Sequence, residues 1–80
     1  MIGLDSMRTL YDVQQLLKRY NIFVYVGKRL WDIELMAIEL DHLYQAGVVA
    51  HKPYLQAKMI LRREHEIEQR REQQKQDKGK

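Results

Sequence analysis

The stretch LWDIELMAIELDHLYQA, residues 30–46, decides the fold of this 80-residue chain. Its apolar residues recur every three or four positions, which is the periodicity of an amphipathic α-helix. Gly47 follows directly, and glycine commonly ends a helix because it adopts positive φ without strain. We therefore expect a helix over about residues 30–46. One apolar stripe of this helix fits a bundle core, and it consists of Ile33, Met36, Leu40, Leu43 and Tyr44.

A second apolar stripe runs along the same helix through Trp31, Leu35 and Ile38, and His42 continues it. A helix that is apolar on two sides must be covered twice. Packing rules favour cover by one helix on either side, as for the middle helix of a bundle. The alternative is a homodimer or an interface with another protein, in which Trp31 would be the natural anchor.

Two flanking helices are expected on either side of this segment. Thr9 and Asp12 have the spacing of an N-cap and its acidic third residue, and helical periodicity then predicts a helix from about Leu10 to Tyr20, with Asn21 as a left-handed C-cap. Pro53 is tolerated in a first helical turn and predicts the start of the last helix. Its expected core residues are Tyr54, Ala57, Ile60 and Leu61.

The segment between the first two helices, Ile22 to Val26, alternates aromatic with β-branched residues and is expected to be extended. It would be either a loop packed over the helices or an edge strand that pairs with a second copy. At the other end, Ile67 is the only aliphatic residue after Leu61, so the chain from Arg62 onward is expected to project into solvent and to fray past Gln73.

These elements predict an all-α fold: a three-helix bundle with a short extended segment between helices 1 and 2 and a protruding charged C-terminal helix. The expected organisation is a flexible N-terminus at residues 1–8, a three-helix domain at 9–67 and a charged, partly disordered tail at 68–80. Within that tail, residues 77–80 are expected to be disordered.

Composition argues against several classes of function. Without cysteine, neither a disulfide framework nor a thiolate zinc site is possible, and a reducing cytoplasm is the simplest setting. No signal peptide or membrane association is expected, since the longest apolar run, residues 22–26, is far shorter than the roughly 20 residues that span a bilayer. Glu39 and His42 form a single Glu-x-x-His pair, whereas a di-iron site needs two, so no metal or cofactor is expected. Ser6 is the only serine, and we expect no catalytic residues and no enzyme activity.

The positive charge lies mainly in the C-terminal third. The net charge is +3, yet residues 1–50 hold five Lys or Arg and six Asp or Glu, against nine and five in residues 51–80. In the last helix, Lys58, Arg62, Arg63 and Arg70 share a broad face that could meet phosphates. The same face could instead carry ordinary surface pairs, because Arg62, Glu66 and Arg70 are spaced four apart.

Lys18 and Arg19 precede the extended segment, and Lys28 and Arg29 follow it. The aromatic residues Tyr20, Phe23 and Tyr25 lie between these two pairs of cations. Cations beside aromatic rings suit single-stranded nucleic acid, since bases stack on exposed rings while Lys and Arg follow the phosphates. Tyr20 and Phe23 are, however, more often core residues. The hypothesis is therefore weak, sequence-tolerant binding of single-stranded RNA or DNA through Lys18, Arg19, Tyr25, Lys28, Arg29, Lys58, Arg62 and Arg63. The competing hypothesis is a homodimer or protein-interaction module built on Trp31, Leu35 and Ile38.

Several blocks of the sequence resemble a known family. They are LYDVQQLLK at 10–18, ELM at 34–36, EL at 39–40 with Gly47, YL at 54–55 with Ala57, and ILRRE at 60–64. Together they resemble the YqgQ-like family of short bacterial proteins, over about residues 9–66. The resemblance implies a three-helix bundle and a cytoplasmic bacterial protein. It implies no activity and no residue roles, although a single-stranded nucleic-acid role has been proposed for such proteins.

Overall fold

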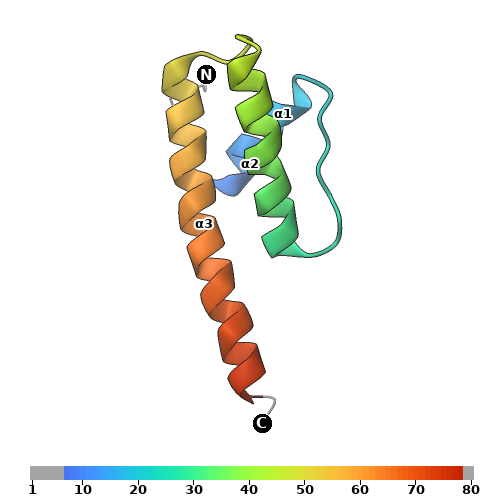
Figure 1. Cartoon of the computed structure of the whole chain (residues 1–80), viewed down its shortest axis with the longest axis vertical. Coiled ribbons are helices and arrows are strands. Elements are labelled where there is room, and N and C mark those ends of the chain that lie inside the picture. The colour runs from blue at the N-terminus through green and yellow to red at the C-terminus, as the bar shows by residue number, and fades with distance from the viewer. Residues whose placement is uncertain (1–6, 79–80) are drawn as a thin grey trace.

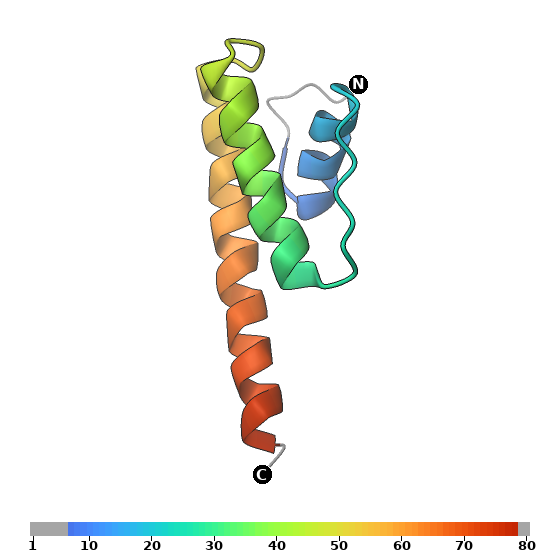
Figure 2. The ribbon, with the colours of Figure 1, turned by 45° about the vertical axis from the view of Figure 1, so that its right-hand side comes forward.

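Three helices make up the part of the chain that the structure describes. The computed structural model describes residues 7–78, with side chains placed through residue 74. The helices are α1 (Leu10–Lys18), α2 (Arg29–Gln45) and α3 (His51–Lys78). α2 and α3 run antiparallel and side by side, and α1 packs against both of them (Figures 1 and 2). The expected all-α three-helix bundle is confirmed, as is its protruding C-terminal helix, because α3 extends well past the first residue of α2 (Figure 1).

No helix among the described residues is long and apolar enough to cross a membrane. The predicted flexible N-terminus, residues 1–8, lies largely outside the described residues, because residues 1–6 are not described. Residues 79 and 80 of the predicted disordered end also lie outside them.

The start of α1 is fixed by a capping box. The Thr9 hydroxyl accepts a hydrogen bond from the backbone N–H of Asp12 at 3.3 Å, and the Asp12 carboxylate accepts one from the backbone N–H of Thr9 at 3.1 Å. These bonds satisfy donors that a helix N-terminus otherwise leaves open. The Asp12 carboxylate also accepts a hydrogen bond from the backbone N–H of Arg8 at 2.9 Å. This bond first, and then the one from the Thr9 N–H, lowers the pKa of Asp12.

Replacing Thr9 with alanine is therefore expected to destabilise the fold. Alanine lacks the hydroxyl that accepts the hydrogen bond from the Asp12 N–H. N-cap substitutions of this kind lower the free energy of unfolding by about 0.5–2 kcal/mol. Urea unfolding followed by circular dichroism would measure it. Thr9→Ser keeps the hydroxyl and serves as the matched control, so equal losses for the two variants would contradict the capping role.

α1 and α2 are each followed by the left-handed residue that the sequence predicted. Asn21 has φ of 61° and Gly47 has φ of 80°. Backbone bonds from Ile22 N–H to Leu17 O and from Asn21 N–H to Lys18 O close α1. At the end of α2, the N–H groups of Val48 and Gly47 donate in the same way to the carbonyls of Leu43 and Tyr44. This pair of bonds is a Schellman motif. Because the last turn of α1 tightens into these bonds, the regular helix ends at Lys18, two residues before the predicted Tyr20.

The extended segment is a loop packed over the helices, the first of the two predicted alternatives. Ile22 and Val24 pack against the core, whereas Phe23 and Tyr25 are 69% and 86% exposed. The alternation expected of a strand is therefore present, but the segment forms no strand ladder within residues 7–78. The side chain of Asp32 accepts a hydrogen bond from the backbone N–H of Val26 at 2.6 Å and fixes the loop to the first turn of α2.

The core uses the first stripe of α2, as predicted. Ile33, Met36 and Leu40 are fully buried, and they meet core residues of α1 and α3. Those residues are Leu10, Val13, Leu16, Leu17, Ala57, Ile60 and Leu61. Leu43 and Tyr54 are partly buried at the margin.

The favoured prediction that helices 1 and 3 also cover the second stripe is wrong. Trp31, Leu35 and Ile38 are 54%, 38% and 49% exposed. The reason is geometric: α1 and α3 both pack on the half of α2 that carries the first stripe, and α1 has only nine residues with which to reach further. The outer half of α2 is left open.

α3 departs from its prediction at both ends. It begins at His51 rather than Pro53, with the N–H of Tyr54 donating to the Ala50 carbonyl, so that proline still lies in the first turn. Beyond Arg62 the helix does not simply project into solvent, because carboxylates hold it to α2. Glu68 is only 7% exposed, and ion pairs link the two helices as far as Glu72, five residues past the predicted domain end. The regular helix continues to Lys78.

Candidate binding surfaces

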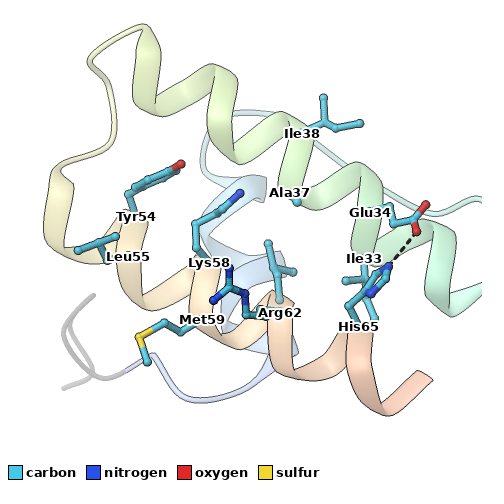
Figure 3. Close-up of a pocket in the computed structure, with 11 residues that line it drawn as sticks. Ile33, Glu34, Ala37, Ile38, Tyr54, Leu55, Lys58, Met59, Arg62 and His65 are labelled. Atoms are coloured by element: carbon cyan, nitrogen blue, oxygen red, sulfur yellow. Dashed lines mark hydrogen bonds and ion pairs between the residues drawn. The ribbon is translucent and has the colours of Figure 1, made fainter. Parts of the chain in front are cut away.

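One concave surface is a groove between α2 and α3. It has a volume of about 580 Å3. Ile33 and Leu61 are buried beneath it, while Ile38 on α2 and Leu55 and Met59 on α3 are exposed along it, the last two by 45% and 72%. Figure 3 shows Ile38 projecting from α2, and Leu55 and Met59 projecting from α3 on the side away from α2. We call this groove, together with the exposed side chains of Trp31 and Leu35, the α2/α3 face.

Polar side chains bridge the groove at its two ends. At one end Asp41 accepts hydrogen bonds from the Tyr54 hydroxyl at 2.8 Å and from the Lys58 ammonium at 3.1 Å. The ring of Tyr54 stacks on that of Tyr44, with centroids 3.9 Å apart. At the other end His65 Nε2 lies 2.8 Å from Glu34 Oε2 (Figure 3). These contacts tie the two helices together and fix the shape of the groove between them.

The Asp41 carboxylate is shifted in pKa by these partners. Desolvation raises its pKa, but the hydrogen bonds from Tyr54 and Lys58 outweigh this effect, and the pKa is lowered from the usual 3.8. The same bond to Asp41 raises the pKa of the Tyr54 hydroxyl. Both shifts favour the native pairing of a charged carboxylate with a neutral phenol near neutral pH.

Asp41→Asn is therefore expected to lose a stabilisation that depends on pH. Because the folded-state pKa lies below the unfolded value, the contribution is present above about pH 4 and is lost as the pH falls through the lowered pKa. The Asp41 side chain is 39% exposed, so the loss at pH 7 should be only about 0.2–1 kcal/mol. Urea unfolding of both proteins at pH 7 and pH 2 would measure it. A difference that is unchanged at pH 2 would contradict the assignment.

Three of the seven predicted phosphate-binding cations are paired with carboxylates. Lys58 binds Asp41 as described, and Lys28 Nζ lies 3.7 Å from Glu72 and 5.0 Å from the centroid of the Trp31 ring. Arg29 lies 3.1 Å from Glu68 and 3.5 Å from Glu64. Arg71 also binds Glu68, at 3.1 Å. The charges of Lys28, Arg29 and Lys58 are therefore largely neutralised by the fold itself.

The other four cations have no side-chain partner among the described residues, but they lie on separate surfaces. Lys18 lines a hollow of about 250 Å3 with Phe23 and Tyr25. Arg19 caps the C-terminus of α1, and Arg62 lines the α2/α3 groove. Arg63 lines a third hollow, which also contains Arg8 and one side of Met59. The structure thus brings Lys18 and Tyr25 together at one hollow and Lys58 and Arg62 together at the α2/α3 groove, and it places the other predicted residues elsewhere.

Sequence reasoning missed Leu55 and Met59 as surface residues. They lie four residues apart on α3, offset from the buried Ala57 and Leu61, so that helical periodicity alone places them outside the core. This offset in the sequence could have predicted that Leu55 and Met59 are exposed. The partner of Arg29, Glu68, was also missed, and no local pattern indicates it because the two residues are 39 positions apart in sequence.

Fold and surface together define a small three-helix protein with an open apolar groove between its two longer helices. The family model described as YqgQ-like matches residues 7–67, and the chain belongs to that family. It is 43% identical over 60 residues to the Bacillus subtilis (strain 168) protein named "Uncharacterized protein YqgQ", an alignment that covers 75% of this chain and 84% of the relative. The family resemblance seen in the sequence is confirmed, and the relative is bacterial, as that resemblance implied.

Proposed function

We propose that this chain is a protein-interaction module that binds through the α2/α3 face and acts in the cytoplasm without catalysing a reaction. One observation carries the proposal: Ile38, Leu55 and Met59 are large apolar side chains exposed along one groove between two helices, and Trp31 and Leu35 are exposed further along α2. Exposed apolar groups that gather on one face mark interaction sites more often than isolated ones do. Trp31 is half exposed at one end of the face, and aromatic residues of this kind dominate the energetics of protein interfaces.

Site-specific photo-crosslinking in cells tests this proposal. A benzophenone amino acid placed at Met59 reports contacts of the α2/α3 face, and the same group at Tyr11, which is 64% exposed on α1, is the control. We expect a discrete protein adduct from position 59 and none from position 11. Adducts of equal yield at both positions, or none at position 59, would count against the face as an interaction site.

We propose weak binding of single-stranded RNA or DNA as a second candidate function. The observation that favours it is the hollow beside α1, where the exposed rings of Phe23 and Tyr25 flank Lys18. Base stacking on an exposed ring contributes about 1–3 kcal/mol per base. Lys18 and Arg19 are the cations nearest in sequence to this hollow, so the contact would span few phosphates.

A fluorescently labelled oligonucleotide, titrated at several salt concentrations, tests this second function. With about two phosphate contacts, the affinity should fall with salt with a logarithmic slope of about −1.4. Tyr25→Ala should weaken binding about 5- to 150-fold, the range that corresponds to one lost stacking contact, whereas Tyr11→Ala should leave it unchanged. Binding that ignores salt, or equal losses in the two variants, would remove the hypothesis.

A further inference from the structure

Leu55 and Met59 form an apolar ridge on the side of α3 that points away from α2 (Figure 3). They lie four residues apart, so they follow one another along the same side of the helix. Met59 lines the outer margin of the α2/α3 groove, and it also lines the third hollow, which has a volume of about 570 Å3. The α3 ridge, as we call these two residues, therefore stands between two concave surfaces.

Cations flank the α3 ridge on both sides. Lys58 and Arg62 line the groove on one side of it, and Arg8 and Arg63 line the third hollow on the other side. The part of α3 that carries the ridge is purely basic, because residues 51–63 hold four Lys or Arg and no Asp or Glu. An exposed apolar strip with positive charge along both edges is typical of a basic amphipathic helix that binds an acidic partner.

Two of the flanking charges are not used within the fold. Arg62 and Arg63 make no ion pair with any described residue. The predicted surface pair of Arg62 with Glu66 does not form, although the two residues are spaced four apart. Arg8 differs, because it lies close enough to Asp12 to interact with its charge. The guanidinium groups of Arg62 and Arg63, one on each side of the ridge, are therefore open to anions from outside the chain.

The surfaces beside the ridge provide almost no negative charge of their own. Glu34 is the one acid among the described residues that line the groove or the third hollow, and it is paired with His65. A second copy of the same ridge would place like charges opposite one another, which is destabilising. Charge complementarity therefore favours an occupant that combines apolar groups with carboxylates.

The shape of this region favours a helix as the form of that occupant. A helix that binds in a groove anchors itself through apolar side chains three or four positions apart, and such side chains can enter the concave surfaces on either side of the ridge. A flat lipid surface would touch the ridge and leave both concave surfaces empty. Methionine suits a contact of this kind because its flexible side chain adapts to the partner.

We infer that the partner of the α2/α3 face is an acidic amphipathic helix of another protein, whose apolar side chains lie against Leu55 and Met59 and whose carboxylates pair with Arg62 on one side and Arg63 on the other. Arginine suits this role because its planar guanidinium group can bind a carboxylate through two hydrogen bonds. This inference rests on the proposed interaction function and names the chemistry of the partner.

Synthetic peptides test the inference on the full chain by fluorescence anisotropy. The probe is a fluorescein-labelled peptide of about 18 residues, or about five helical turns, with leucines on one side and glutamates beside them. A second peptide carries lysine in place of every glutamate, and a third spreads the same leucines around the helix. The probe should bind saturably, and the other two should bind at least about 10-fold more weakly. A dissociation constant above about 1 mM for the probe, or equal binding of all three peptides, would overturn the inference.

Charge reversal on α3 tests the role of the two arginines. Arg62→Glu combined with Arg63→Glu should weaken binding of the probe at least about 10-fold and should bind the lysine peptide more tightly than the wild type does. A misfolded chain would not gain affinity for the lysine peptide, so the reversed preference separates an effect of charge from loss of the fold. Both residues are exposed, and circular dichroism checks the helix content. A variant with native helix content and an unreversed preference would contradict the inference.

Substitution of Met59 tests the apolar contact. Met59→Gln should weaken binding of the probe about 5-fold or more, because a polar amide replaces a side chain that becomes buried in the complex. Met59→Leu keeps the apolar character and is the matched control, so it should bind nearly as the wild type does. Equal affinities for the two variants would show that the ridge takes no part.

Two further measurements separate the possible partners. Phosphatidylglycerol vesicles that bind the chain more tightly than the probe does would overturn the inference in favour of a lipid surface. The crosslink at Met59 in cells, with the attached segment mapped by mass spectrometry, supports the inference if that segment is an acidic helix. An adduct to a basic or uncharged segment, or to a second copy of this chain, overturns the inference but leaves the interaction module standing. The absence of any adduct removes both.

Discussion

Replacing Leu40 with alanine is expected to lower the free energy of unfolding by about 2–5 kcal/mol. Leu40 has no exposed surface and lies in the middle of α2, within the core that all three helices share. Truncation loses the transfer free energy of the buried methyl groups and leaves a cavity that close-packed neighbours can fill only in part. Domains of this size have only about 4–12 kcal/mol of total stability, so the variant should lose a large share of it and unfold at a lower urea concentration than the wild type.

Urea unfolding followed by far-ultraviolet circular dichroism measures the Leu40 effect. Leu55→Ala is the matched control, because the same chemical change is made on α3 at a side chain that is 45% exposed. Leu55→Ala should lower the free energy of unfolding by no more than about 0.5 kcal/mol. Comparable losses for the two variants would show that Leu40 is not the core residue described here.

The opposite change, Ala57→Leu, is expected to cost about 1–3 kcal/mol or more. Ala57 is fully buried among the core side chains, where an added isobutyl group has no free volume. Either α3 must shift outward or neighbouring side chains must leave their preferred rotamers. A shift of α3 would also widen the groove and strain the bonds from Tyr54 and Lys58 to Asp41.

Ala46→Leu provides the comparison for overpacking, since Ala46 is exposed at the C-terminus of α2. Thermal unfolding should give a clearly lower midpoint for Ala57→Leu and little change for Ala46→Leu. A stable, native-like Ala57→Leu variant would mean that the core has more free volume than the buried fractions indicate.

Local sequence was sufficient to predict the helices and their ends. The capping residues Thr9, Asn21 and Gly47 act through bonds to positions three to five residues away, so their roles can be inferred from spacing alone. The core stripe of α2 followed from periodicity for the same reason. What covers Trp31 and Leu35 could not be predicted, because it depends on where α1 and α3 lie around α2, which no local pattern fixes.

The candidate surfaces were less predictable than the fold. Lys28 and Arg29 precede α2 and look free in sequence, yet they meet carboxylates at positions 64, 68 and 72. Those three acids are spaced four apart along one side of α3, but only the antiparallel register of α2 and α3 shows that this side faces Arg29. By contrast, Lys18 and Tyr25 were predicted to act together, and they line one hollow because the loop folds back over α1.

The ion pairs that Arg29 and Lys28 make with α3 imply that the two ends of this long helix respond differently to ionic strength. Near Ala57 the helix is held by apolar packing, which salt does not screen. Around Glu68 it is held mainly by charges, and at 1 M salt the Debye length falls to about 3 Å. Backbone amides of residues 68–74 should therefore exchange hydrogen faster in concentrated salt, while those near residue 57 keep their protection.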